Sequence, residues 1–152
     1  MARSWKFFIA SSAVILILTA AAKLFSLLQP DAILNYADPL LNVTNRRILQ
    51  FTSLLEISGA IVLLMASRQA FSFLVIWTIS AQFVLYRVLL WQLDPAAPCA
   101  CLGRVGSWLP ISERGLSLIL GGIALYMFLG SSLGLLRLYL NRVRTVSREP
   151  VF

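Results

Sequence analysis

The residues best suited to chemistry are two cysteines, Cys99 and Cys101, separated by one alanine. A thiol pair at this spacing has three uses: an exchangeable disulfide, two ligands of a soft metal, or a small structural staple. A disulfide across so short a ring departs from relaxed geometry, which makes it comparatively oxidising and easily exchanged. Pro98 and Gly103 flank the pair and favour an exposed loop. All three uses remain open at this point.

The absence of histidine narrows the chemistry. The chain contains no His, which excludes haem, zinc or copper held by imidazole and every Ser/His or Cys/His catalytic arrangement. A metal held by the two thiolates would need further ligands from a partner protein. The sequence therefore leaves thiol exchange, a staple or a shared thiolate metal site.

The composition predicts an integral membrane protein. Hydrophobic residues make up 59% of the 152 residues, charged residues only 12%, and the mean hydropathy is +0.84. We expect an all-α four-helix transmembrane bundle forming a single domain over residues 1–152, in contact with the lipid bilayer. The expected spans are 7–28, 48–65, 70–93 and 115–136, joined by exposed loops at 29–47 and 94–114 and followed by a basic tail, 137–152.

The distribution of basic residues predicts the orientation. The net charge is +7, but the basic residues cluster at segment ends and in the tail, as juxtamembrane residues do, which argues against nucleic-acid binding. The face with both termini carries the larger set and is expected to be cytoplasmic. That set is Arg3, Lys6, Arg68, Arg137, Arg142, Arg144 and Arg148, against Arg46, Arg47, Arg104 and Arg114 on the other face. The cysteine loop then faces the periplasm of a bacterial inner membrane, where disulfides persist.

Three ionisable residues, Lys23, Glu56 and Arg87, lie inside expected spans. Each costs about 2.5–3.5 kcal/mol to insert at the centre of a membrane helix, so it is by default buried, paired and a candidate for function. At 1.5 Å per residue, Lys23 and Arg87 lie about 24 Å from the cytoplasmic helix ends, and Glu56 lies about 12 Å below the outer end. All three therefore converge on the outer leaflet, below the cysteine loop.

Two interpretations of these residues remain open. Lys23 and Arg87 are long enough to snorkel to the outer headgroups, whereas Glu56 is too short and needs a partner or a proton. Lys23 is able to bridge the difference in depth, which predicts an ion pair between the first two helices. The alternative is a polar pocket, with Gln82, Tyr86 and Arg87, that does chemistry or binds a quinone-like head group.

Glycines on the last span predict close helix contacts. Gly121 and Gly122 are adjacent, and Gly130 and Gly134 stand four residues apart. Small residues at such positions allow membrane helices to approach one another closely. We expect these glycines to pack against neighbouring helices.

Three sequence segments together resemble a known family. The first span ends with Ala21-Ala22-Lys23-Leu24-Phe25, the second contains Leu55-Glu56-Ile57-Ser58-Gly59-Ala60, and the loop before the last span carries Cys99-Ala100-Cys101-Leu102-Gly103. This combination resembles the MauE/DoxX group of small four-helix membrane proteins, and the cysteine motif is similar to that of the MauE-like branch. Leu102 stands where phenylalanine is commoner. The resemblance covers roughly residues 7–136.

The resemblance implies a four-helix bundle associated with periplasmic redox or disulfide chemistry. MauE-like proteins are linked to maturation of a disulfide-rich dehydrogenase, and DoxX-like proteins to quinone-linked sulfur oxidation. By this analogy Cys99 and Cys101 are the exchanging pair, and Lys23 and Glu56 belong to a pocket in the membrane. The chain has a single cysteine pair, whereas membrane disulfide oxidases of the DsbB type use two, so a complete relay needs a partner.

Two functional hypotheses follow. The first is a thiol–disulfide oxidoreductase that exchanges through Cys99 and Cys101 with a periplasmic thiol protein and is linked to quinone or to maturation of a redox complex. The second is a non-catalytic structural or assembly subunit of a larger membrane complex, in which the disulfide only shapes the loop.

Overall fold

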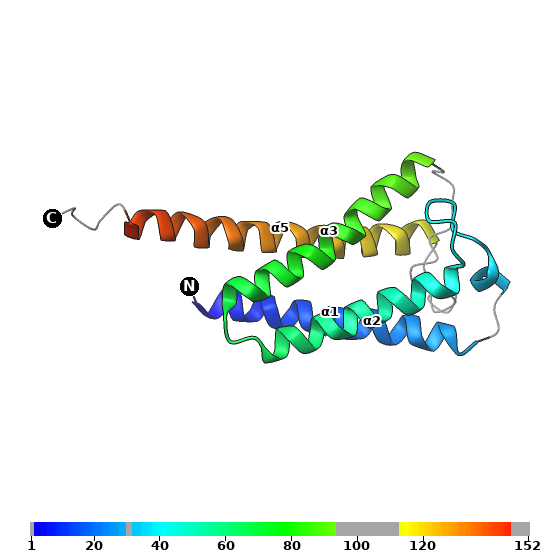
Figure 1. Ribbon diagram of the computed structural model, residues 1–152, viewed down its shortest axis with the longest axis horizontal. Coiled ribbons are helices and arrows are strands. Elements are labelled where there is room, and N and C mark those ends of the chain that lie inside the picture. The colour runs from blue at the N-terminus through cyan, green and yellow to red at the C-terminus, as the bar shows by residue number, and fades with distance from the viewer. Residues whose placement is uncertain (1, 30–31, 94–112, 147–152) are drawn as a thin grey trace.

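The computed structural model describes residues 2–29, 32–93 and 113–146 (Figure 1). Over these residues the chain forms four long antiparallel α-helices and one short 3₁₀ helix, η1, at Ala32–Asn35. The long helices are α1 (Ala2–Leu27), α2 (Asn45–Met65), α3 (Gln69–Leu93) and α5 (Glu113–Val146). Cys99 and Cys101, with the rest of the expected loop up to residue 112, lie outside the described residues.

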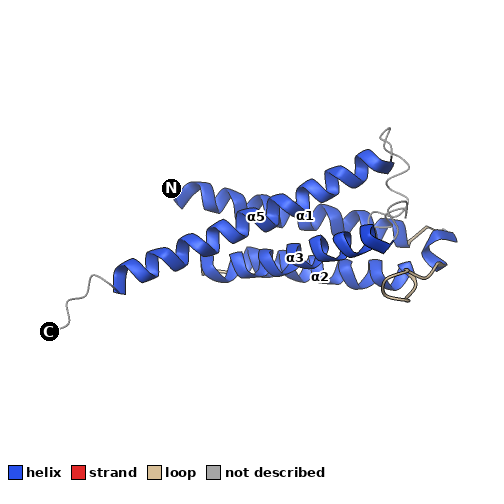
Figure 2. Ribbon diagram, turned by 90° about the horizontal axis from the view of Figure 1, so that it is seen from above, coloured by secondary structure: helices blue, strands red, loops and turns tan. Residues whose placement is uncertain are grey.

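The helices have the length and apolar character of membrane spans. Each of the four contains a window of mean hydropathy between 1.8 and 2.1 and is long enough to cross a membrane. The all-α prediction is confirmed. The last helix is longer than expected, because α5 continues as one helix of 34 residues through positions 137–146; Figure 2 shows it running beyond the other helices toward the C-terminus.

The order of the elements brings distant residues to one end of the bundle. The start of α1, the link between α2 and α3, and the end of α5 lie at one end (Figure 1). The link is only residues 66–68, where the extended Ala66 ends α2 and the Arg68 carbonyl accepts the N–H groups of Phe71 and Ser72. At the opposite end, α1 finishes, α2 begins, α3 finishes and α5 begins. The segment 94–112 is therefore attached at both ends to this second end of the bundle.

The helices pack as two pairs, α1 on α2 and α3 on α5. An aromatic cluster joins the pairs near the termini: Trp5, Phe8 and Phe73 lie with ring centroids 5.2–6.4 Å apart. Gly130 packs against the Phe8 ring, and Gly134 packs against the Phe73 ring, so closely that a Cβ at either position would overlap the ring. The packing predicted for these two glycines is confirmed.

The packing expected of the other glycine pair is not found throughout. Gly121 lies opposite the Arg87 side chain, at ordinary contact distance, but Gly122 is exposed and a Cβ there would meet no atom within 4 Å. The prediction is therefore wrong for Gly122. Adjacent residues on an α-helix point about 100° apart, so one neighbour faces the bundle while the other faces outward.

Candidate functional site

The centre of the candidate site is an ion pair between α1 and α2. Lys23 Nζ lies 2.5 Å from Glu56 Oε1, and the two residues are only 4% and 2% exposed. The predicted ion pair is confirmed. The alternative that Lys23 snorkels to the outer headgroups is wrong, because a carboxylate within the bundle satisfies its charge. Lys23 stands near the end of α1 and Glu56 near the middle of α2, so the long lysine stem spans their difference in level.

An aromatic ring from a third helix completes the environment of the lysine. Lys23 Nζ lies 4.8 Å from the centroid of the Phe83 ring on α3, a cation–π contact. The sequence analysis did not identify Phe83. The available signal was its place one turn before Arg87 and next to Gln82, but an apolar residue in an apolar helix does not stand out.

The second oxygen of Glu56 carries an unmet hydrogen-bonding capacity. Glu56 Oε2 is buried and has no hydrogen-bond partner among the described residues. The nearby hydroxyls of Thr19 and Ser80 donate to backbone carbonyls of their own helices, at 2.7–3.1 Å. Buried carboxylate oxygens normally accept a hydrogen bond. Among the described residues, Oε2 therefore lacks the donor that a buried carboxylate oxygen normally has.

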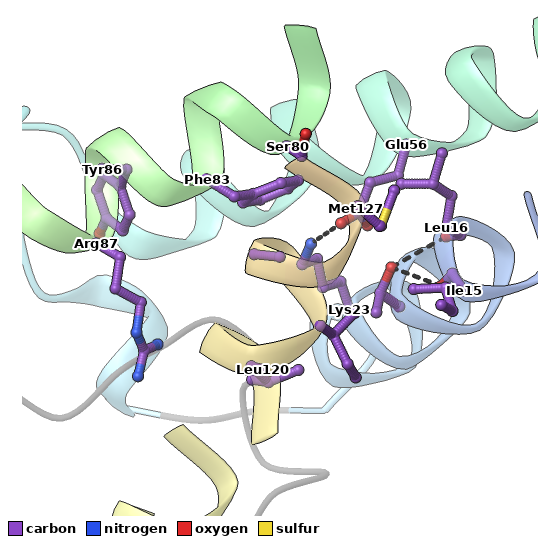
Figure 3. A pocket seen from close by; sticks show the side chains of 13 residues that line it. Ile15, Leu16, Lys23, Glu56, Ser80, Phe83, Tyr86, Arg87, Leu120 and Met127 are labelled. Carbon is purple, nitrogen blue, oxygen red and sulfur yellow. Dashed lines mark hydrogen bonds and ion pairs between the residues drawn. The ribbon is translucent and has the colours of Figure 1, made fainter. Parts of the chain in front are cut away.

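A cavity of about 80 Å³ lies between α1, α2, α3 and α5, and Glu56 is part of its lining. Figure 3 shows Lys23 and Glu56 joined across it, with Leu16, Ser80 and Met127 close by and Arg87 directed away from the pair. We call this space the inner cavity. Its lining consists of Ile15, Leu16, Thr19, Lys23, Glu56, Ser80, Phe83, Tyr86, Arg87, Leu120, Ile123, Ala124 and Met127.

A larger cavity of about 440 Å³, the outer cavity, lies between α2, α3 and the connection that precedes α2. Lys23, Phe83 and Tyr86 line both cavities and so form the wall between them. The volume falls in the range of small-molecule sites, about 300–1,000 Å³. The remaining lining residues are Leu41, Val43, Asn45, Arg47, Ile48, Leu49, Phe51, Thr52, Leu55 and Gln82.

A second polar contact fixes the wall of the outer cavity. The Tyr86 hydroxyl donates to Asp38 Oδ2 at 2.5 Å, and Asp38 is 4% exposed. Asp38 Oδ1 accepts the backbone N–H groups of Leu40 and Leu41, both at 2.9 Å. Both carboxylate oxygens of Asp38 therefore have partners, whereas only Oε1 of Glu56 has one among the described residues. Asp38 was not among the site residues predicted from the sequence.

The backbone around Asp38 forms a compact turn that covers the outer cavity. Asp38 N–H donates to the Val43 carbonyl at 2.8 Å, and Ala37 pairs with Thr44 as an isolated β-bridge. Asn42 takes a positive φ of 52°, a conformation that asparagine tolerates better than most residues. The turn thereby presents Leu41 and Val43 to the outer cavity.

The structure divides the predicted site residues into groups. It joins Lys23 with Glu56 directly, and places Tyr86 beside Lys23 in the wall between the cavities. Gln82 lines only the outer cavity and Arg87 only the inner one, so the predicted pocket is two adjacent spaces rather than one. The positions of Cys99 and Cys101 lie outside the described residues.

This arrangement presents complementary groups to a ligand. Lys23 supplies N–H donors at the wall of both cavities, Glu56 supplies an acceptor to the inner one, and apolar side chains form most of the remaining surface. A buried ion pair adds little net stability because desolvation offsets the attraction between the charges. A pair with one oxygen left open is therefore better explained by binding or proton transfer than by stability alone.

Comparisons of the chain with protein-family models, with curated proteins and with solved structures found no match. The residues themselves and the geometry of the two cavities around Lys23 and Glu56 are therefore the basis for assigning a function.

Proposed function

We propose that the protein is a redox-associated inner-membrane protein that exchanges thiol/disulfide equivalents through Cys99 and Cys101 and passes electrons to a quinone-like head group in the membrane. The observation that carries the proposal is the buried Lys23–Glu56 pair beside a cavity of about 440 Å³, within helices long enough to span a membrane. A lipid-soluble ring with oxygen substituents matches such a site in size and polarity.

The topology supports a link between this site and the cysteines. Segment 94–112, which contains both thiols, starts at the end of α3 and returns at the beginning of α5. Those two points lie at the end of the bundle where α1 finishes (Figure 1). Lys23 and Tyr86 belong to the last third of α1 and of α3, which run toward this end.

The exchange is balanced in electrons and protons. Oxidation of the Cys99 and Cys101 thiols to a disulfide forms one S–S bond and releases two electrons and two protons. Reduction of a quinone to a hydroquinone consumes two electrons and two protons. A periplasmic thiol protein that is oxidised by the Cys99–Cys101 disulfide regenerates the dithiol.

The proposal includes an orientation and a partner. In this proposal both termini lie in the cytoplasm of a bacterium, and segment 94–112 faces the periplasm, where disulfides persist. The partner is a periplasmic thiol protein, or a membrane redox complex that the protein helps to mature.

Thiol trapping of the full chain in native membranes tests the exchange. We expect Cys99 and Cys101 to shift between the alkylated and the protected state across a series of glutathione redox buffers. Cys99→Ser is expected to abolish the protected state and the activity in cells. A pair that stays oxidised under strongly reducing glutathione, or a fully active Cys99→Ser variant, would contradict the proposal.

A second candidate function is a structural or assembly subunit of a larger membrane complex. It is favoured by α5, which runs beyond the other helices and exposes Leu136, Tyr139, Leu140 and Val143. Crosslinking and co-purification from the native membrane discriminate the two functions. A stable complex that survives the Cys99→Ser substitution favours the subunit, whereas a mixed disulfide that requires Cys99 or Cys101 favours the exchange.

A further inference from the structure

The two cavities meet at Lys23, and Lys23 alone among the residues that line both is paired with Glu56. We propose that Glu56 is a proton-relay residue, which takes protons from water in the inner cavity and passes them through Lys23 to a ligand oxygen in the outer cavity. This inference rests on the proposed function, because it assigns the proton path for the same quinone-like ligand.

The inner and outer cavities differ in volume and therefore fit different contents. The outer cavity, at about 440 Å³, has room for a ring head group. The inner cavity, at about 80 Å³, is smaller than the cavity of about 150 Å³ that accommodates benzene, whereas a buried water needs only about 10–15 Å³. The inner cavity therefore fits a few water molecules.

The chemistry of the lining also favours water at Glu56. A buried water needs two to four polar partners. Glu56 Oε2 offers an acceptor that no donor among the described residues occupies, and the hydroxyl oxygens of Thr19 and Ser80 in the same lining retain lone pairs. A water that donates to Oε2 and to one of these hydroxyl oxygens satisfies the carboxylate. The rest of the inner cavity wall is largely apolar, which holds the water close to the pair.

The proton transfers balance as follows. As the ligand accepts an electron pair from the dithiol, an N–H bond of the Lys23 ammonium breaks and an O–H bond forms on the ligand. The Glu56 carboxylate then takes a proton from a hydronium ion in the inner cavity, which leaves neutral water, and passes this proton to the neutral amine, so that the ion pair is restored. A second passage delivers the second proton of the hydroquinone, and the two protons lost by the thiols enter water.

Within residues 2–29, 32–93 and 113–146, few other titratable groups face the pair. Helix α3 contributes Tyr86 and Arg87 to the inner cavity, and the described part of α5 contributes only apolar side chains there. The Tyr86 hydroxyl is committed to Asp38, and Figure 3 shows Arg87 directed away from Lys23. Glu56 is therefore the group placed to exchange protons with Lys23.

Infrared difference spectroscopy tests the relay in full-length protein in nanodiscs, with decylubiquinone as the probe reduced at an electrode. The background Cys99→Ser/Cys101→Ser keeps the measurement independent of thiol exchange. Labelling with ¹³C-glutamate restricts the carboxyl signal to Glu56, Glu113 and Glu149. We expect a labelled carboxyl band to change on reduction, to persist in Glu113→Gln and Glu149→Gln, and to disappear in Glu56→Gln.

The reduction rate of the bound probe supplies a second readout. In Glu56→Gln we expect the proton-coupled rate to fall by about 10²-fold, the lower end for a positioned proton-transfer group, and to lose its pH dependence and solvent isotope effect. Glu56→Asp should restore both in part, whereas the exposed Thr78→Val on α3 should leave both unchanged.

The outcomes separate the two proposals. If decylubiquinone binds and is reduced without a change in any glutamate carboxyl band of the wild-type sequence, the relay is wrong and the proposed quinone site stands. This result does not depend on whether the Glu56 variants fold. If decylubiquinone does not bind at all, both the relay and the quinone part of the proposed function are overturned.

Discussion

The two ends of the bundle use opposite means of holding helices together. Near the termini, Trp5, Phe8 and Phe73 interlock with the small Gly130 and Gly134, and the contacts are apolar. At the other end, Lys23, Glu56, Tyr86 and Asp38 make polar contacts around two cavities. A pocket of about 150 Å³ also lies at this first end, lined by Trp5, Gln69, Phe73, Gly134, Arg137, Leu138 and Asn141. Among the described residues, however, this lining holds neither a buried ion pair nor a buried acceptor without a partner. The second end leaves space and an unmatched acceptor, which are the features of a binding site.

The largest expected effect comes from breaking the buried ion pair. Replacing Glu56 by leucine leaves Lys23 as an unpaired buried cation, and Lys23→Met leaves Glu56 as an unpaired buried anion. We expect either change to lower the free energy of unfolding by about 3–5 kcal/mol. Thermal unfolding in detergent, followed by circular dichroism, measures the loss.

The double variant Lys23→Met/Glu56→Leu sharpens the comparison between the ends. It converts the polar end into an apolar one, so we expect most of the lost stability to return, while binding of a quinone probe is lost. The exposed Lys6→Met is the matched control, with little expected effect. If the double variant loses as much free energy of unfolding as the two single variants together, Lys23 and Glu56 are not energetically coupled.

The next effect concerns the contact between Tyr86 and Asp38. Tyr86→Phe removes the donor and leaves a buried carboxylate oxygen unpaired, which is expected to cost about 1.5–3 kcal/mol because the acceptor is charged. Hydrogen exchange should show the Leu40 and Leu41 amides opening more often. A double-mutant cycle with Asp38→Asn isolates the contact, and additive single effects would show that the two side chains are not coupled.

A comparable or slightly smaller effect is expected at the packed end. Gly134→Ala places a Cβ against the Phe73 ring and is expected to cost about 1–3 kcal/mol through overpacking. The matched control is Gly122→Ala on the same helix, which meets open space and should be neutral or slightly stabilising because alanine favours helices. Equal destabilisation by the two changes would contradict the assigned packing. Thermal unfolding is again the measurement.

The smallest effect is expected from the ring above Lys23. Phe83→Leu keeps an apolar side chain but removes the cation–π contact, and the expected loss is about 0.5–2 kcal/mol. Because Phe83 also lines both cavities, the change should alter binding of a quinone probe to the outer cavity. Tryptophan fluorescence quenching by the probe, compared with that of the wild type, measures this change. Unaltered binding would show that the ring does not contact the ligand.

Sequence and structure agree best on the level of each residue along its helix axis. The rise of 1.5 Å per residue placed Lys23 and Glu56 within reach of one another before any contact was known. Hydropathy located the four helices along the chain. The small size and the spacing of Gly130 and Gly134 predicted that both contact neighbouring helices. The confirmed ion pair followed from level and charge alone, because an ionisable residue in a span needs a partner.

Rotation about the helix axes was decided by the tertiary structure. In a soluble amphipathic helix, the polar face points to solvent and the opposite, apolar face is buried. The four helices here are apolar on most sides, so their sequences do not indicate which side faces the other helices. That is why Phe83 was missed, Gly122 was misassigned, and one expected pocket proved to be two. Asp38 was missed for another reason, because it lies in the connection between η1 and α2, where helix geometry predicts no contact. Sequence alone determined the spans, their levels and the chemistry excluded by the absence of histidine. Packing decided which side chains meet and left Glu56 Oε2 open, because only neighbouring helices determine whether a buried oxygen finds a donor.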